Sequence, residues 1–253
     1  MPGQQFLFRK FQLASYAARL ACGGRPSDGL AVLRDRYLGY AAMDWQARIA
    51  GSCRTIIDAG AHTGEVSRAL CLAFQPRQLL AIEANPALAA GLRSRFAAQP
   101  QVRVEAVALA EQNGTLPFFL QDFDAASSLF PLREGYLASI GLPEGARRIE
   151  VPARRLDEVA ADAGIAELDL LKLDCQGSEL RILHGAGAFL RRIRCIYTEV
   201  TFEPIYACGA LFHEVHAFLR AAGFRLTHLE CGGGALGNID QGDAVYLRTD
   251  AAP

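Results

Sequence analysis

Short apolar runs alternate with longer amphipathic segments along most of this chain. Strands are typically apolar runs of about four to eight residues, whereas helices repeat apolar positions every three to four residues. The pattern predicts strands over seven ranges: Thr55–Ala59, Leu79–Glu83, Val102–Ala108, Leu168–Asp174, Cys195–Val200, Phe224–Leu229 and Ala244–Leu247. It predicts helices over five ranges: Glu65–Phe74, Pro86–Ala98, Leu156–Ala163, Ser178–Leu190 and Leu211–Ala222.

This alternation predicts an α/β fold of the doubly wound class. Parallel strands need a crossover connection, usually a helix, so strands that alternate with helices form a mostly parallel sheet covered on both faces. Only a loop, residues 230–242, joins the last two predicted strands, and the final strand is therefore expected to be antiparallel. We expect a Rossmann-like, mostly parallel seven-stranded sheet with an antiparallel last strand.

Two regions depart from the alternation. Residues 110–155 hold one predicted hairpin strand (Thr115–Leu120), a serine-rich turn and a loop with several glycines. Long insertions of this kind usually shape the substrate side of an α/β domain. Residues 1–50 are expected to form a helical cap. The predicted organisation is thus a cap over 1–50 and a Rossmann-like domain over 51–253, with an insertion at about 110–155.

Composition narrows the class of protein. The chain has 253 residues, 51% of them hydrophobic, and a net charge of −1, which is typical of a globular protein and gives no basic excess for a nucleic-acid partner. Seven cysteines without a CxxC pair indicate reduced thiols and a cytoplasmic location. No apolar run is long enough to be a transmembrane segment. Residues 5–20 are basic and amphipathic. They are predicted either to lie on a membrane surface or to pack on the domain or a second subunit of a homo-oligomer.

Candidate chemistry begins at the turn after the first predicted strand, in IIDAGAHTGE, residues 56–65. In doubly wound sheets, ligands bind beyond the carboxyl ends of the strands. The pattern Asp58-Ala-Gly60-Ala-His62-Thr-Gly64 puts histidine where a dinucleotide fingerprint has glycine, and it adds a carboxylate that would repel phosphate. A carboxylate attracts an ammonium or a sulfonium. S-adenosylmethionine, a phosphate-free nucleoside with net positive charge, fits this turn better than a dinucleotide.

The second predicted strand supports a nucleoside ligand. Glu83 ends this strand, 25 residues after Asp58, where a carboxylate can accept hydrogen bonds from both ribose hydroxyls. The ribose of NAD would use the same acid, so Glu83 alone does not separate the two cofactors.

These blocks resemble the FkbM family of S-adenosylmethionine-dependent methyltransferases. The resemblance runs from Thr55 to Arg248 and rests on IIDAGAHTGEVS, AIEANP, VEAVALAE, SSL, LLKLDCQGSELRILHGA, YTEVTFEPIYACGALFHEV and DAVYL, in that order. It implies a class I methyltransferase fold and O-methyl transfer to a hydroxyl of a small natural product, sugar or glycan. The chain departs from the family's D-x-E-G-x-E block, because Gln176 stands at the middle acid.

The resemblance and the turn together predict the residues that bind the cofactor. Ser128 is included through the resemblance alone. The predicted contacts are Asp58, Gly60, Ala61, His62, Thr63, Gly64, Glu83, Ala84, Asn85, Ala108, Ser128 and Asp174.

Methyl transfer to a hydroxyl needs alignment and removal of a proton. Asp174 ends a buried strand and is the leading catalytic candidate, although it could instead cap the following helix. Glu199, in the apolar strand IYTEV, needs a partner or a function and is the second candidate. His184 is a third, as a base or as a cation at a helix end. A magnesium-like ion held by Asp174 and Glu199 is a further hypothesis.

Two alternatives to a methyltransferase stay open at this point. One is an oxidoreductase that binds NAD on the same sheet, against which His62 and Asp58 argue. The other is a non-catalytic module that has kept the cofactor pocket, which Gln176 favours because an amide cannot act as a general base.

Overall fold

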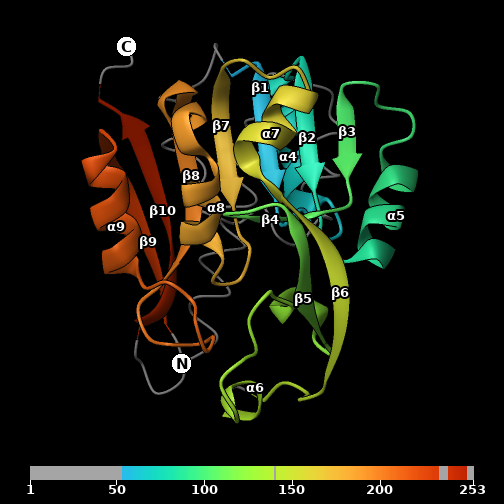
Figure 1. The fold of residues 1–253 in the computed structure, drawn as a ribbon, viewed down its shortest axis with the longest axis vertical. Helices are drawn as coiled ribbons and strands as arrows, with labels where there is room; N and C mark the ends of the chain where they lie inside the picture. Colours follow the sequence, from blue (N-terminus) through green and yellow to red (C-terminus); the bar gives the residue numbers. More distant parts are fainter. Residues whose placement is uncertain (1–52, 140, 234–238, 250–253) are drawn as a thin grey trace.

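A seven-stranded sheet forms the centre of the molecule in a computed structural model that describes residues 53–139, 141–233 and 239–249. The strand order is β3-β2-β1-β7-β8-β10-β9 (Figure 1). All neighbouring strands pair in parallel except β10, which is antiparallel to both β8 and β9. The strands are β1 (Thr55–Ala59), β2 (Gln78–Ile82), β3 (Val102–Glu105), β7 (Leu168–Leu173), β8 (Ile193–Thr201), β9 (Phe224–Gly233) and β10 (Ile239–Arg248). The predicted doubly wound fold with an antiparallel last strand is confirmed.

Helices cover both faces of this sheet, as alternating strand side chains require. In β1, Ile56 packs into a cluster with Leu70 and Leu92, which come from α4 and α5. The next residue, Ile57, points to the opposite face and packs into a larger cluster that includes residues of the other three helices. The helices are α4 (Glu65–Phe74), α5 (Pro86–Arg95), α7 (Leu156–Asp162), α8 (Glu179–Gly185) and α9 (Phe212–Ala221).

The predicted insertion is a second, three-stranded sheet. Its strands are β4 (Ala108–Ala110), β5 (Gly114–Gln121) and β6 (Ala146–Arg155), in the order β4-β6-β5. A short 3₁₀ turn, η1 (Asp124–Ala126), and a one-turn helix, α6 (Tyr136–Ser139), lie between β5 and β6. Figure 1 shows this sheet beyond the carboxyl ends of β1, β2 and β7, so it faces the edge at which ligands are expected.

The structure corrects three predicted elements. The single strand expected over Val102–Ala108 is two strands, because β3 stays in the main sheet while β4 begins the second one. The helix expected over Ser178–Leu190 ends at Gly185 and is followed by a 3₁₀ segment, η2 (Gly187–Arg192). Strand β6 forms in a part of the insertion for which no strand was predicted. The helical cap predicted for residues 1–50, and the surface helix predicted for residues 5–20, lie outside the described residues.

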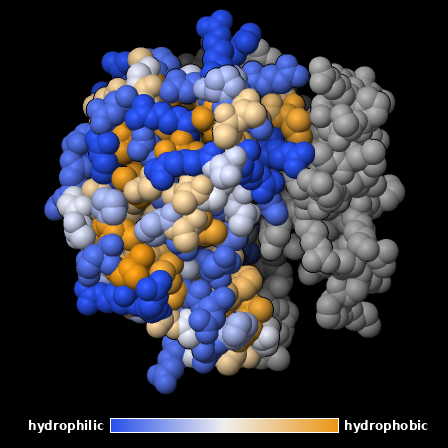
Figure 2. All heavy atoms as spheres, turned by 90° about the vertical axis from the view of Figure 1, so that its right-hand side faces the viewer, coloured by the Kyte–Doolittle hydropathy of each residue, from blue (hydrophilic) through white to orange (hydrophobic). Residues whose placement is uncertain are grey.

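The surface over α5 and the second sheet mixes polar and apolar residues. Figure 2 shows small apolar groups interspersed with hydrophilic residues on this face. Across the described parts of the chain, none of the helices is both long enough and apolar enough to cross a lipid bilayer.

Candidate active site

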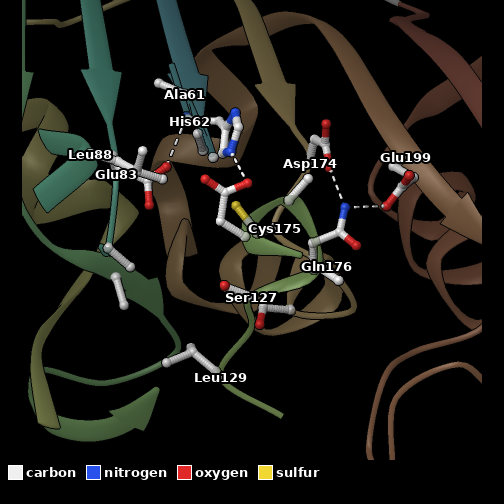
Figure 3. A pocket seen from close by; sticks show the side chains of 18 of the residues that line it. Ala61, His62, Glu83, Leu88, Ser127, Leu129, Asp174, Cys175, Gln176 and Glu199 are labelled. Carbon is white, nitrogen blue, oxygen red and sulfur yellow. Dashed lines mark hydrogen bonds and ion pairs between the residues drawn. The ribbon is translucent and has the colours of Figure 1, made fainter. Parts of the chain in front are cut away.

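A cavity of about 360 Å³ opens at the carboxyl ends of the main sheet, under the second sheet (Figure 3). Its walls come from the turn after β1, the end of β2, strand β4, the η1 region, the segment after β7, and strands β8 and β10. Eight of the predicted cofactor residues line it: Gly60, Ala61, His62, Thr63, Glu83, Ala84, Ala108 and Asp174. The catalytic candidate Glu199 lines it as well.

Gly60 shapes the turn at one side of this cavity. Its φ is +74°, and a Cβ built there would lie 1.8 Å from the backbone oxygen of Asp174, so no other residue fits. The backbone N–H groups of Gly60 and Ala61 both donate to the oxygen of Ile82, each at 3.0 Å. The turn after β1 is thus tied to β2 and pressed against the end of β7.

Glu83 is buried beside this turn, and its carboxylate is already held in place. Oε2 accepts from the backbone N–H of His62 and Oε1 from that of Asn85, each at 2.8 Å. Burial raises the pKa of Glu83, and these two bonds oppose the rise. Each oxygen keeps a second lone pair for a ligand in the cavity.

Asp58 does not face the cavity, contrary to the prediction. Its carboxylate is fully buried, accepts a hydrogen bond from the Ser67 hydroxyl, and lies 3.2 Å from Lys172 Nζ. The Lys172 ammonium also lies 3.5 Å from Asp174 and 3.0 Å from the oxygen of Gly60. Burial lowers the pKa of Lys172, but Asp58 and Asp174 outweigh it and the net pKa is raised. Asp58 therefore does not contact a ligand in the cavity. It pairs with Lys172, and the Lys172 ammonium in turn holds the backbone of the turn at Gly60.

The other end of the cavity brings both carboxylate candidates together. The side-chain amide of Gln176 donates to Asp174 Oδ1 at 2.7 Å and to Glu199 Oε2 at 3.0 Å (Figure 3). Its Oε1 accepts from the Tyr206 hydroxyl at 2.6 Å. Burial first, and then the charge of Asp174, raise the pKa of Glu199 well above that of an ordinary carboxyl.

The hypothesis of a magnesium site at Asp174 and Glu199 is not supported. The amide nitrogen of Gln176 lies within hydrogen-bond distance of both carboxylates, where a shared cation would have to sit. Over the described ranges, no three His, Cys, Asp or Glu side chains are grouped so that they could hold a metal ion.

Asp243 is a cavity residue that the sequence analysis missed. It lies opposite Glu199 in the antiparallel pairing of β10 with β8, and both residues line the cavity. Burial, followed by the nearby Asp174 charge, raises the pKa of Asp243 to about 7, while a hydrogen bond from Tyr197 opposes the rise. In the sequence, Asp243 is a polar residue directly before the apolar run of β10. That position does not reveal that Asp243 lies opposite Glu199 in the folded sheet.

Three further predicted residues, besides Asp58, do not line the cavity. Gly64 packs against α5, since a Cβ there would lie 2.6 Å from the Leu92 side chain. Asn85 caps α5 by accepting from the N–H of Ala87. Ser128 is buried and donates to the backbone oxygen of Gln176 at 2.7 Å, while its neighbour Ser127 lines the cavity.

His184, the third catalytic candidate, does not line the cavity. This residue is exposed on α8, and its ring packs edge-on against Phe218 of α9, with 4.6 Å between the ring centroids. The side chain of His184 therefore lies on the side of α8 that packs against α9, and it is not part of the cavity wall.

A side-chain contact joins the insertion to the turn after β1. His62 Nε2, on the turn after β1, lies 3.1 Å from Asp124 Oδ1 at the start of η1. The insertion therefore contacts the same turn that it covers.

Comparison with known proteins gives the family. The model of the FkbM methyltransferase domain matches residues 58–226. The 2-O-methyltransferase NoeI of Sinorhizobium fredii is 27% identical over 157 residues, which are 60% of this chain and 65% of that protein. The 31-O-demethyl-FK506 methyltransferase FkbM of Streptomyces tacrolimicus is 41% identical over 87 residues, 34% of this chain and 32% of that protein.

The alignments span less than two thirds of both relatives. A solved structure, the methyltransferase domain of METTL16, resembles this fold with a TM-score of 0.50 and 12% identity, over 87% of this chain and 69% of that one. The family model covers more than half of the chain, from the end of β1 to the start of β9. The chain therefore belongs to the FkbM family of methyltransferase domains.

Proposed function

We propose that this protein transfers a methyl group from S-adenosylmethionine to a hydroxyl of a small natural product, sugar or glycan. The observation that carries the proposal is one continuous cavity with two chemically different ends. One end has the glycine turn and Glu83, which suit a nucleoside. The other has Glu199 beside Asp174, which suits removal of a proton from a hydroxyl.

The cavity fits the charge and shape of S-adenosylmethionine. Glu83 can accept hydrogen bonds from the ribose hydroxyls, and the apolar residues Leu88, Ala108 and Leu129, which line the cavity, can contact a purine. The cavity is lined by six carboxyl residues and only one lysine, and that lysine is already paired with Asp58 and Asp174. A ligand with net positive charge is therefore favoured over a dinucleotide. Family membership among methyltransferases points in the same direction and removes the ground for the oxidoreductase alternative.

Transfer to oxygen is the chemistry named for two relatives, the 2-O-methyltransferase and the 31-O-demethyl-FK506 methyltransferase. An attacking hydroxyl oxygen forms a bond to the methyl carbon while the carbon–sulfur bond breaks and its electron pair stays on sulfur. The hydroxyl proton must then go to a base. Glu199 suits this role better than Asp174, because both oxygens of Asp174 already face donors, Lys172 and Gln176.

Calorimetry tests the cofactor assignment. S-adenosylhomocysteine is expected to bind with a 1:1 stoichiometry, and NAD is expected not to bind. Tight binding of NAD without binding of S-adenosylhomocysteine would overturn the assignment.

A transfer assay tests the reaction. Purified protein is incubated with methyl-labelled cofactor and a panel of hydroxylated acceptors, and the methylated position is located by NMR. The variant Glu199→Gln is expected to bind S-adenosylhomocysteine like the wild type and to lose transfer. Cofactor binding with no transfer to any acceptor would favour the non-catalytic module instead.

A further inference from the structure

Three hydrogen bonds hold the Gln176 side chain at the acceptor end of the cavity. Its amide nitrogen donates to two carboxylates, and its amide oxygen accepts from Tyr206. Its backbone oxygen accepts from the Ser128 hydroxyl. Its φ is +55°, a left-handed conformation that an unbranched residue adopts only at a cost. The surrounding structure holds this residue in place against that cost.

The orientation of the amide follows from its partners. Ionised carboxylates only accept hydrogen bonds, so the nitrogen has to face Asp174 and Glu199. The reversed amide would place its oxygen between two carboxylates and leave no donor for them. The Tyr206 hydroxyl, which also lies 3.2 Å from the oxygen of Ala126, then donates to Oε1. Tyr206 therefore fixes the amide on the side away from the acids.

The groups around Glu199 include three acids, and Gln176 is the residue that donates a hydrogen bond to its carboxylate. The charged neighbours of Glu199 are Asp174, Glu179, Asp243 and Lys172. Three of them are acids that disfavour its ionised form, and the Lys172 ammonium is closer to Asp58 and Asp174, at 3.2 and 3.5 Å. The Gln176 amide is a neutral donor placed directly on a Glu199 oxygen, and a donor favours the ionised form of a carboxyl.

We propose that Gln176 is a positioning residue that joins Asp174 to Glu199 and favours the ionised, proton-accepting form of Glu199. The amide supplies two donors without adding charge, which a glutamate at this position cannot do. This proposal rests on the proposed function, because it assigns Glu199 as the base of the methyl transfer.

The first test removes the amide donor of Gln176 and keeps a non-glycine residue at this positive φ. Gln176→Met is unbranched and of similar length but cannot donate. We expect the acidic limb of the kcat/KM profile to move about one pH unit or more to higher pH, which is about a tenfold loss on that limb, with recovery at high pH. Gln176→Glu, which adds a carboxylate, is expected to move the limb at least as far. Affinity for S-adenosylhomocysteine should change by less than about threefold, because Gln176 lies away from Glu83.

Gln78→Met is the matched control. The Gln78 amide donates to the oxygen of Ala163 at 2.7 Å, at the amino end of β2, so the same chemical change is made far from the cavity. Its pH profile is expected to equal that of the wild type. If Gln176→Met lost activity equally at every pH, the residue would be structural and the proposal would be wrong.

A second readout does not depend on turnover. Carboxyl ¹³C NMR of protein labelled in glutamate reports the ionisation of Glu199, which is assigned by the signal missing from Glu199→Gln. The midpoint of its titration is expected to rise in Gln176→Met and, by a smaller amount, in Tyr206→Phe, which keeps the amide but removes its anchor. An unchanged midpoint in both variants would overturn the proposal. Absence of methyl transfer in the wild type, with the shift present, would overturn only the proposed function.

Discussion

At the scale of single residues, the site depends on a few positions where geometry leaves no choice of side chain. Gly60 is the clearest, because backbone of β7 occupies the place of its missing Cβ. Lys172 is another. It is buried with Asp58 and next to Asp174, and an unpaired charge in either place would be costly. Such residues serve the chemistry by fixing backbone and charge rather than by touching the acceptor.

Gly60→Ala tests the backbone requirement. Alanine would need φ near +74° and would push its Cβ against the oxygen of Asp174. We expect a loss of about 2 kcal/mol or more in the free energy of unfolding, measured by chemical denaturation, and weaker binding of S-adenosylhomocysteine. Gly164→Ala is the matched control, because Gly164 has nearly the same φ, +72°, but its added Cβ would meet nothing within 4 Å. Equal behaviour of the two variants would show that the turn is not tightly packed.

Glu83→Ala tests the proposed ribose contact. Each charge-assisted bond to a ribose hydroxyl contributes about 1.5–3 kcal/mol, so affinity for S-adenosylhomocysteine should fall about tenfold or more in calorimetry. The backbone N–H groups of His62 and Asn85 also lose their acceptor, so circular dichroism and thermal unfolding must show that the variant is folded. A loss of affinity below about twofold would place the ribose elsewhere.

At the scale of elements, the second sheet forms a wall of the cavity and has its own small core. Val151 of β6 is fully buried there with Phe118 and Leu129, while Phe118 and Leu129 also line the cavity. A change in the packing of this small core is therefore expected to change the cavity wall as well.

Val151→Ala tests that cooperation. Removing two buried methyl groups should cost about 1–3 kcal/mol of stability and loosen β5 and β6. We expect faster limited proteolysis within residues 114–155 and weaker binding of S-adenosylhomocysteine. Val245→Ala makes the same change in the fully buried core of the main sheet, outside the cavity. Faster cleavage of the insertion in Val245→Ala as well would mean that the second sheet does not open independently.

The same elements show which parts of the fold could be predicted from sequence. Buried parallel strands such as β2 and β7 are nearly continuous apolar runs, and their ends placed Glu83 and Asp174 at one edge. Strand β6 was missed because half of its residues are exposed and it carries charges and a proline, so it has no apolar run. Asp243 was missed because its position depends on the register of β10 with β8, which is a property of the folded sheet.

At the scale of the whole molecule, the buried acids make stability depend on pH. Burial raises the pKa of Glu179 to about 7 and that of Asp243 to about 7, from ordinary values of 4.5 and 3.8. Glu199 shifts in the same direction. In the unfolded chain these groups lose their protons near the ordinary values, whereas the folded protein keeps them up to about pH 7. Between those limits the folded state binds more protons, so the free energy of unfolding falls as pH rises.

We therefore expect the ligand-free protein to lose roughly 2–4 kcal/mol of stability between pH 5 and pH 8, measured by chemical denaturation at each pH. The raised pKa of Lys172 does not oppose this trend, because its contribution is constant far below its ordinary value of 10.5. Asp243→Asn removes one shifted group and should reduce the slope. Asp162→Asn, at an exposed carboxylate paired with Arg154, should leave the slope unchanged. Stability that stays level or rises over this range would show that the buried acids of the folded protein lose their protons near their ordinary pKa values.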